Sequence, residues 1–587
     1  MNADNLQQVP WQSRTGATLI VDGFKRYNRE FRRITQRAEQ HFVNRDFAAQ
    51  SRDLNARIEL YDASVADIST TLIEILGEAA SRRDIWEGIK AAYAELIQSE
   101  LDQELYKTFY NTLTRRFFKT RGVAPAIEFV ALDIEPTDRI THPVARLVYH
   151  PNGDWQRGFE KLLADTPFAR HFTDLEACAN RLAEALAQRV QHWPNGAARA
   201  IELLQTRFYR ERRCYLMGRL FGDDRFGPIV IALTNSDAGI EADALIVDRE
   251  DFSQLVGFTR SYFLADFETV GDAIVFLQTL APRKPVDEWY AMLGRLKQAK
   301  TERYRHFVRH FDQARDDTGA PELFRHADGE RGMVMAVFTL HSYPLVFKLI
   351  RDQFAPPKNV TREEVAAKYQ LVFKHDRAGR LIDAQEFRFL RFPLARFHQP
   401  LLDELVQGCA QSVYVDGDDL VIMHCYVERK LRPLNLFVKE APTELVHKAV
   451  VDYGQAIKDL AISNIFPGDL LLKNFGVTRH SRAIFYDYDE ICLVTECRFR
   501  RMPEPSDHDE EMHHGAWYHV DDFDVFPEQF PRFLGLTDAQ REALIAAHGD
   551  IFTVPFWLDL QNRFRKGLPP EMTPYPERLR LRSGAGL

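Results

Sequence analysis

Three side chains between residues 465 and 490 have the types and the spacing that phosphoryl transfer from ATP requires. Asp469 is followed five residues later by Asn474, and Asp487 comes thirteen residues after Asn474, behind an apolar run. One carboxylate can orient the proton of an attacking hydroxyl group, while the second carboxylate and the amide oxygen can hold Mg²⁺ on the phosphates. This order and spacing are typical of the catalytic loop and metal-binding Asp of protein kinases.

A turn is the simpler interpretation of the first part of this pattern. The tripeptide 467–469, Pro-Gly-Asp, is good turn chemistry, and an Asp followed by an Asn at this interval is very common. The usual kinase flanks are also altered, because Phe-Pro-Gly precedes Asp469 and Asp-Tyr-Asp begins at Asp487. The second acid at the kinase distance, behind a strand-like run, nevertheless favours the catalytic interpretation, which requires a kinase small lobe upstream.

Composition limits the class of protein. A chain of 587 residues with an apolar fraction of 45% is long enough for several domains with full cores. The formal net charge of −9 provides no basic excess for phosphate backbones, so we expect no nucleic-acid partner. Six cysteines without CxxC spacing indicate reduced thiols. Because we find neither a secretion signal nor an apolar run of transmembrane length, we expect a cytoplasmic protein with no membrane partner.

The first half of the chain has mostly helical patterning. From Ala17 to about residue 205, and again from 267 to 313, apolar residues recur at intervals of three and four. Between residues 213 and 251, short β-branched runs separated by Gly, Asp and Asn turns predict a small antiparallel meander. The polar stretch 312–321, which contains a Gly and a Pro, is the predicted boundary to the next domain.

After this boundary the sequence predicts strands around a glycine-containing loop. Residues 321–326, 334–340 and 345–350 are strand-like, and the loop 327–333 contains two glycines. Glycines allow backbone N–H groups to approach phosphates, and Lys348 in the third strand can supply a cation to them. An unpaired ammonium is costly in an apolar strand, which favours a functional role for Lys348. A Lys that reaches solvent from an edge strand is the alternative.

A capping box at 361–364, Thr-Arg-Glu-Glu, predicts a helix from Glu363 to about residue 373. Protein kinases place here the helix whose Glu pairs with the Lys of the third strand. The sequence does not distinguish Glu363 from Glu364 for this role, because Glu364 can be used by the cap.

Asp383 lies within a further strand-like stretch, 381–387. Asp is disfavoured within strands, so this residue is either solvent-facing or functional. Farther on, the buried run 419–426 leads into residues 427–430, which we interpret as the hinge whose backbone meets adenine.

Longer phrases of the sequence resemble one family, the bacterial isocitrate dehydrogenase kinase/phosphatases. The resemblance covers the full chain and rests on ordered phrases at 233–237, 327–335, 423–429, 464–469, 473–480 and 485–490. It implies a bifunctional enzyme that phosphorylates a serine in the active site of NADP-dependent isocitrate dehydrogenase and also removes that phosphate. Such an enzyme sets the flux between the citric acid cycle and the glyoxylate bypass. The implied ligands are ATP, ADP in the phosphatase direction, Mg²⁺, and AMP as an allosteric ligand.

The resemblance also implies roles for individual residues. Asp383 matches the active-site acid of the family, Asp469 matches its catalytic acid, and Asn474 and Asp487 match its Mg²⁺ ligands. We find no residue-by-residue match for the AMP pocket. The implied ATP site comprises Lys348 and the loop Ala327, Asp328, Gly329, Glu330, Arg331, Gly332 and Met333.

Patterns and resemblance together predict an α+β protein with two domains. Residues 1–318 are expected to form a mainly α-helical regulatory domain with a small β meander. Residues 319–587 are expected to form a bilobal protein-kinase-like domain, with a small lobe over about 319–428 and a large lobe over about 429–587.

A separate phosphatase site would need its own chemistry. Cys492 and Arg498 have the spacing of a thiolate phosphatase, but no glycine lies between them and an intervening Glu would repel phosphate, so we reject that site. The acids and histidines at 507–514, with His519, Asp521 and Asp522, lack metal-ligand spacing, and an acidic loop that reads the protein substrate is their best functional interpretation.

We therefore expect one nucleotide site to serve both reactions, with Asp383 or Asp489 as the base in the phosphatase direction. Two rival interpretations remain open from the residues alone: a kinase-like ATP-binding scaffold without catalysis, and a kinase that acts on a different substrate.

Overall fold

The computed structural model describes residues 11–130, 142–191, 193–257, 263–354, 360–375, 379–502, 519–521, 523–568 and 570–581, and only the backbone of 373–375. The chain forms two compact units. The first comprises Met1–Gly257, Tyr262–Asp312 and Tyr575–Leu587, and the second comprises Phe258–Ser261 and Gln313–Pro574. Each unit is described by itself.

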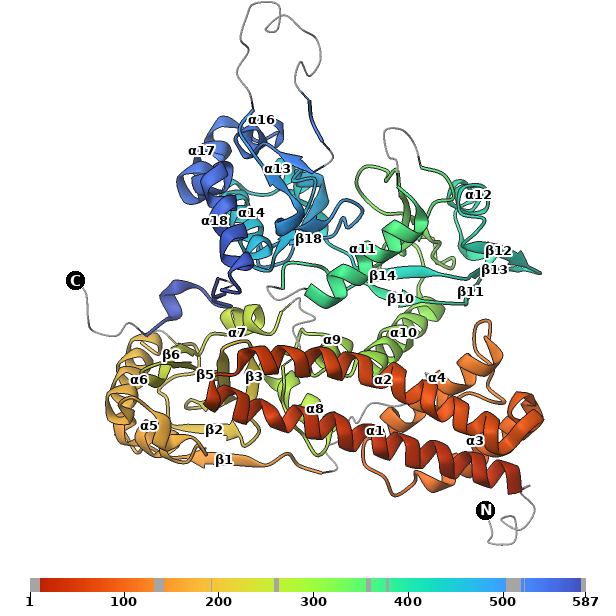
Figure 1. Cartoon of the computed structure of the whole chain (residues 1–587), viewed down its shortest axis with the longest axis horizontal. Coiled ribbons are helices and arrows are strands. Elements are labelled where there is room, and N and C mark those ends of the chain that lie inside the picture. Colours follow the sequence, from red (N-terminus) through yellow and green to blue (C-terminus); the bar gives the residue numbers. More distant parts are fainter. Residues whose placement is uncertain are drawn as a thin grey trace, which may run out of the picture. The chain divides into compact units, whose positions relative to one another are not determined.

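Ten α-helices are described in the first unit (Figure 1). Several begin after an Asp whose carboxylate accepts a hydrogen bond from a backbone N–H of the first turn: Asp46, Asp154, Asp174 and Asp248. Such caps satisfy orphan donors and explain where these helices begin. The helices are α1 (Trp11–Asn44), α2 (Phe47–Leu76), α3 (Arg83–Leu96), α4 (Gln103–Phe118), α5 (Trp155–Ala164), α6 (Leu175–Arg189), α7 (Arg249–Leu255), α8 (Val270–Leu280), α9 (Val286–Met292) and α10 (Leu296–Gln313).

The first unit also contains an antiparallel sheet of six strands in the order β1-β2-β4-β5-β6, with β3 paired to β4. The predicted meander corresponds to β4–β6, and the sheet is larger than predicted because β1–β3 join it. These first three strands are short, so their period-two pattern is weak beside the helical segments that precede them. The strands are β1 (Arg146–Tyr149), β2 (Ala200–Leu204), β3 (Phe208–Arg210), β4 (Arg213–Phe221), β5 (Phe226–Ser236) and β6 (Gly239–Ile246).

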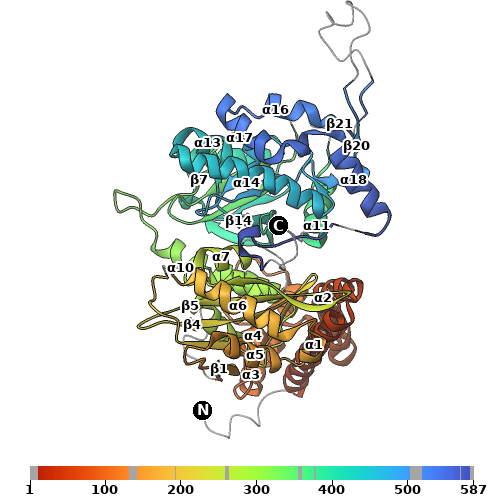
Figure 2. The same ribbon diagram turned by 90° about the vertical axis from the view of Figure 1, so that its left-hand side faces the viewer.

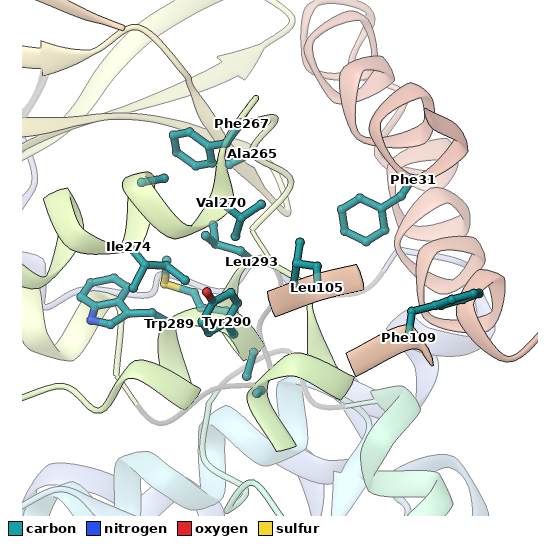
Figure 3. Packing of buried hydrophobic residues seen from close by; sticks show 14 of the residues in the cluster. Phe31, Leu105, Phe109, Ala265, Phe267, Val270, Ile274, Trp289, Tyr290 and Leu293 are labelled. Carbon is teal, nitrogen blue, oxygen red and sulfur yellow. The ribbon is translucent and has the colours of Figure 1, made fainter. Parts of the chain in front are cut away.

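Both faces of this sheet are covered by apolar side chains. Tyr215 and Met217 of β4 belong to a core shared with α1, α3, α4, α8 and α9, while Cys214 and Leu216 belong to a second core with α5 and α6. This alternation follows from the period of two along a strand. Figure 3 shows how aromatic residues such as Phe109 of α4 and Trp289 of α9 build the first of these cores.

The end of the chain also packs in the first unit. Arg580 forms a backbone bridge with Ala244 of β6, and the backbone N–H of Leu581 donates to the carbonyl of Asp243 at 2.7 Å. The expected catalytic domain, 319–587, placed this segment with the kinase lobes. The structure differs because the partner of such a short segment is set by tertiary pairing, which leaves no local pattern in the sequence.

The small lobe of the second unit is built on a five-stranded antiparallel sheet in the order β10-β14-β9-β8-β7. A three-stranded sheet, β11-β13-β12, and the helix α12 are inserted between β10 and β14. The elements are β7 (Arg325–His326), β8 (Met335–Thr339), β9 (Leu345–Ile350), α11 (Arg362–His375), β10 (Gln385–Phe387), β11 (Leu390–Pro393), α12 (Gln399–Gly408), β12 (Val413–Asp416), β13 (Asp419–Ile422) and β14 (Cys425–Arg429).

The large lobe is mainly helical, with α14, α17 and α18 gathered together (Figure 2). A short sheet, β15-β17-β18, and the pairs β16-β19 and β20-β21 complete it. The elements are β15 (Arg432–Pro433), α13 (Leu434–Glu440), α14 (Thr443–Ile462), β16 (Ile465–Phe466), β17 (Phe475–Val477), β18 (Ala483–Phe485), β19 (Cys492–Leu493), β20 (Arg498–Phe499), β21 (Asp524–Val525), α16 (Phe530–Phe533), α17 (Asp538–His548) and α18 (Val554–Arg565).

Within the described ranges, no single helix is both long and apolar enough to cross a membrane. The segments Asp538–Phe552 and Val554–Arg565 reach that length and composition only as a pair bent by 46°.

Candidate functional site

Lys348 lies on β9, in the interior of the small-lobe sheet, between Val337 of β8 and Tyr426 of β14. Its side chain is only 9% exposed, and its ammonium lies 2.7 Å from a carboxylate oxygen of Glu428. The ammonium also donates to the backbone carbonyl of Tyr486 at 2.8 Å. The alternative of a Lys that reaches solvent from an edge strand is therefore wrong, because the charge is buried and paired.

The expected acid of α11 is not the partner of this Lys. Glu363 and Glu364 are both exposed in the first turn of the helix. The carboxylate of Glu364 accepts from the backbone N–H of Thr361 at 2.7 Å and so closes the capping box. The buried side of α11 carries Tyr369, whose ring stacks on that of Tyr426 with centroids 3.8 Å apart.

The loop predicted to be catalytic, residues 467–474, follows β16 and is closed by hydrogen bonds of its own side chains. The carboxylate of Asp469 accepts from the N–H of Leu471 at 2.8 Å, and the amide of Asn474 donates to the carbonyl of Asp469 at 3.3 Å. The turn interpretation is thus correct for the local geometry. It does not exclude catalysis, because the turn also presents Asp469 at the head of the loop that carries Asn474.

A hairpin brings Asn474 beside Asp487. Strands β17 and β18 pair in antiparallel register from Phe475↔Phe485 to Val477↔Ala483. The N–H of Tyr486 donates to the carbonyl of Asn474 at 3.1 Å, so the residues that flank the hairpin meet at its open end. The amide oxygen of Asn474 and the carboxylate of Asp487 are ligand types that suit Mg²⁺, whose other ligands in kinase sites are phosphate and water oxygens.

Charge around Tyr486 confirms that these segments share one region. Burial raises the pKa of the Tyr486 hydroxyl, and the negative charges of Asp487, Glu428 and Glu330 raise it further. These three carboxylates come from the hairpin, from β14 and from the glycine-containing loop. Lys348 therefore lies in an acidic environment that favours cations.

The loop Ala327–Met333 connects β7 to β8, and residues 328–333 are exposed. Gly329 has a φ of 109°, a backbone conformation that side chains with a Cβ rarely adopt. Asp328 lies 3.0 Å from Arg432, and Glu330 lies 3.3 Å from Lys473. The loop thus contacts cations of the large lobe, one of which, Lys473, directly precedes Asn474.

On the small-lobe side the same loop is held by two charged residues. The Arg351 guanidinium donates to the carbonyl of Gly332 at 3.1 Å and to Glu404 of α12 at 2.6 Å. Glu404 also lies 3.5 Å from Arg331. The inserted helix α12 therefore helps to position the loop.

Asp383 precedes β10 instead of lying within a strand, so the predicted strand 381–387 begins later than expected. Leu381 forms a parallel bridge with Phe485 of β18, which carries the following residues of both segments in the same direction. The segments that carry Asp383 and Asp487 therefore run side by side, and the hydroxyl of Tyr488 donates to the carbonyl of Ile382. The carboxylate of Asp383 accepts from the amide of Gln385 at 3.0 Å. The Asp was placed in a strand because the apolar residues on either side of it mimic one.

Sequence reasoning missed two residues of this site. Lys473 begins one of the phrases that carry the family resemblance, and its position next to Asn474 is a signal that could have assigned it a role. Glu428 was assigned to a hinge that acts through its backbone, whereas residues 427–429 belong to β14 and the Glu428 side chain holds Lys348. Only the pairing of β9 with β14 reveals that contact.

The rejected thiolate site has no phosphate-binding geometry. The sulfurs of Cys492 and Cys497 lie 3.5 Å apart, and both residues are buried. The guanidinium of Arg498 points to other partners, the carboxylates of Asp521 and Asp524. An arginine held by two acids is unavailable to a phosphate next to Cys492.

The acidic loop proposed for substrate reading lies outside the described residues over 507–514 and at Asp522. Of the remainder, His519 lies 2.7 Å from Asp521. Among the described residues, no group of three or more His, Cys, Asp or Glu could hold a metal ion. A site of one Asp and one Asn, completed by phosphates, is a different kind of site.

Two family models match the chain. The first, the isocitrate dehydrogenase kinase/phosphatase (AceK) kinase domain, matches residues 322–577. The second, the regulatory domain of the same family, matches residues 17–315.

Curated proteins that carry the name isocitrate dehydrogenase kinase/phosphatase are similar over almost the whole chain. The protein of Xanthomonas campestris pv. campestris (strain 8004) is 52% identical over 98% of this chain and 100% of its own length. That of Xanthomonas euvesicatoria pv. vesicatoria is 53% identical, over 96% and 97% respectively. That of Anaeromyxobacter sp. (strain Fw109-5) is 43% identical, over 97% and 98%.

Proposed function

Because the chain belongs to the isocitrate dehydrogenase kinase/phosphatase family, we propose that it both phosphorylates and dephosphorylates NADP-dependent isocitrate dehydrogenase. This activity controls the flux between the citric acid cycle and the glyoxylate bypass. The observation that carries the proposal is similarity over the whole chain. The contact of Lys348 with the carbonyl of Tyr486 and the hydrogen bond from the N–H of Tyr486 to the carbonyl of Asn474 support it.

In the kinase direction, Asp469 orients the serine hydroxyl of the dehydrogenase and accepts its proton. The serine oxygen bonds to the γ-phosphorus of ATP, and the bond to ADP breaks. Lys348 and the loop 327–333 hold the phosphates. Asn474 and Asp487 would hold Mg²⁺, which neutralises charge on the phosphate oxygens when it is bound.

In the phosphatase direction, the same residues hold the phosphoserine and the nucleotide. Water, or the terminal phosphate of bound ADP, supplies the oxygen that bonds to the phosphorus of the phosphoserine, and the bond from phosphorus to the serine oxygen breaks. The serine oxygen takes up a proton, and Asp383, whose segment runs beside that of Asp487, is the candidate base for an attacking water. The parallel alignment of the segments that carry the two acids supports this assignment. A single site explains how one small lobe serves both reactions.

The first unit is the proposed regulatory part, with AMP as its allosteric ligand. We assign regulation to about residues 1–318 and catalysis to about residues 319–574, with the last segment packed on the first unit. The dehydrogenase is the proposed protein partner and the cytoplasm the proposed location, as for a metabolic enzyme of this kind.

Transfer of labelled phosphate from ATP to purified NADP-dependent isocitrate dehydrogenase tests this proposal, with Asp469→Ala beside the wild type. We expect the variant to lose about 10²-fold or more of the labelling, the usual effect of removing a general base. The exposed Asp538→Ala on α17 is the matched control and should label normally.

Wild-type enzyme given ADP should then remove the label. ATP binding without any labelling would favour a non-catalytic scaffold, and labelling of other proteins alone would remove the dehydrogenase as substrate. Full phosphatase activity in Asp469→Ala would separate the two reactions.

A further inference from the structure

We propose that Glu428 of β14, and not an acid of α11, is the residue that positions Lys348 for phosphoryl transfer. The inference rests on the proposed kinase/phosphatase function and specifies how its central cation is held. It also implies that α11 supports the site through aromatic packing instead of an ion pair.

The pair is built into the sheet itself. Strands β9 and β14 are hydrogen-bonded neighbours in antiparallel register, with Tyr426 opposite Lys348 and Glu428 opposite Val346. Side chains two residues apart on a strand point to the same face, so Glu428 and Lys348 emerge on one side of the sheet. There the ammonium and carboxylate meet at 2.7 Å, with Lys348 7% and Glu428 1% exposed.

Because the ion pair of Lys348 and Glu428 is buried, loss of either partner is costly. A buried ammonium without a counter-charge is strongly disfavoured, and loss of one member of a buried pair leaves the other uncompensated. Glu428 therefore compensates the buried charge of Lys348 and fixes one direction of its ammonium, while the carbonyl of Tyr486 at 2.8 Å fixes another. The two contacts aim the ammonium at the backbone segment that leads into Asp487.

The usual arrangement in protein kinases is different, because there the Lys pairs with a Glu of a mobile helix. Movement of that helix makes or breaks the pair. In this protein the partner lies on a strand paired directly with β9, so displacement of α11 cannot open the pair. The ion pair of Lys348 and Glu428 is thus formed independently of the position of α11.

The inner face of α11 shows what the helix does instead. Tyr369 stacks on Tyr426 with an interplanar angle of 10° and donates its hydroxyl to the sulfur of Met335 at 3.3 Å. Tyr369 also meets Tyr488 edge-on, with ring centroids 5.0 Å apart. The place where a kinase helix would present its Glu is thus filled by an aromatic ring.

Tyr488 connects this packing to the metal-binding segment. It directly follows Asp487, and its hydroxyl donates to the carbonyl of Ile382 at 2.6 Å. The aromatic cluster Tyr369–Tyr426–Tyr488 therefore supports Asp487, whereas Glu428 supports Lys348. In protein kinases one helix supplies the acid that pairs with the Lys. In this chain the acid comes from β14, and α11 contributes aromatic packing.

Three variants that replace a carboxylate by an uncharged amide test the proposal: Glu428→Gln, Glu363→Gln and Glu364→Gln. Glu428→Gln should lower kcat for labelling of the dehydrogenase about tenfold or more. The two α11 variants should stay within about twofold of the wild type, since Gln preserves the capping box at position 364. Titration with MgATP should show the same order, with affinity reduced about fivefold or more only in Glu428→Gln.

A double-mutant cycle with Lys348→Met distinguishes positioning from a general loss of structure. If Glu428 acts through Lys348, adding Glu428→Gln to Lys348→Met should lower kcat by less than about threefold more. Equal losses in both backgrounds would overturn the proposal, as would an α11 variant that loses as much as Glu428→Gln. If the wild type labels no dehydrogenase, the proposed function fails, while the MgATP affinities of the same variants still decide the role of Glu428.

Discussion

Each unit buries a charged pair in its largest sheet, and the two pairs are surrounded differently. In the first unit, Asp243 of β6 accepts from Arg213 at 3.1 Å and from Arg580 at 2.9 Å, and from the hydroxyl of Tyr575. In the second unit, Lys348 has Glu428 and the carbonyl of Tyr486 as partners. The first pair is enclosed by side chains that belong to the fold, whereas the second lies against the catalytic segment.

The surroundings of a buried charge therefore indicate whether it stabilises the fold or serves a binding site. Burial alone would raise the pKa of Asp243, but the Tyr575 hydrogen bond and the charges of Arg213 and Arg580 outweigh it and hold this pKa below its usual value. That carboxylate stabilises the fold and ties the end of the chain to β6. The Lys348 pair instead adjoins an exposed loop and Asp487, where substrate phosphates would approach.

The largest expected effect is on catalysis, from Lys348→Met. We expect phosphate transfer to the dehydrogenase to fall about 10²-fold or more, because a preorganised cation next to the phosphates is lost. Single-turnover labelling at saturating ATP measures this change. Arg213→Met is the matched control, since it removes an equally buried cation from the other sheet. Transfer by Lys348→Met within a factor of about ten of the wild type would break the comparison.

Arg213→Met should have the complementary effect, on stability. Without the Arg213 guanidinium, the buried Asp243 carboxylate has one cation fewer beside it. We expect the free energy of unfolding of the first unit to drop by about 3 kcal/mol. Hydrogen exchange of β4 and β6 during urea titration reports this value locally.

The control for that stability change is Arg580→Ala, whose side chain is 38% exposed. It should cost no more than about 1 kcal/mol, because solvent screens a partly exposed pair. If Arg213→Met and Arg580→Ala lowered the free energy of unfolding equally, burial would not determine how much each contact stabilises the first unit. MgATP affinity should stay unchanged in both variants.

A third buried titratable group, Glu104 of α4, makes the stability of the first unit depend on pH. Burial, with the nearby charge of Asp102, raises the pKa of Glu104 from 4.5 to about 8, and Tyr290 donates to this carboxyl at 3.0 Å. The folded state therefore keeps a proton that the unfolded chain releases above about pH 4.5. Its contribution to stability is complete below that pH and is lost as the pH rises toward 8.

Glu104→Gln should remove this dependence. Relative to the wild type, the variant should gain up to about 1.4 kcal/mol per pH unit between about pH 4.5 and pH 8. Urea unfolding at several values in this range measures the trend, with the exposed Glu59→Gln of α2 as control. A difference between variant and wild type that stays constant with pH would contradict a shifted Glu104.

Local patterns predicted the elements of the site well, and tertiary contacts less well. Strand β9 was predicted at its observed bounds, and α11 within a few residues. Both signals, a short apolar run that follows a turn and a capping box, lie in consecutive residues of the sequence. The strand placed at Asp383 began too early, since apolar flanks alone do not distinguish a strand from an extended segment beside β18. The expected partner of Lys348 was wrong because kinase precedent, and not pairing, selected α11.

The sequence by itself determined the chemistry available to this protein. The spacing of Asp469, Asn474 and Asp487 around a hairpin, and a Lys within an apolar strand, depend only on residue order and short-range geometry. Only the tertiary structure decided which residues far apart in the sequence contact each other. Glu428 pairs with Lys348, the segment of Asp383 lies beside the segment of Asp487, and Asp243 contacts Arg580. The physical reason is that strand pairing and parallel docking join residues far apart in the chain, and no local periodicity records the partner.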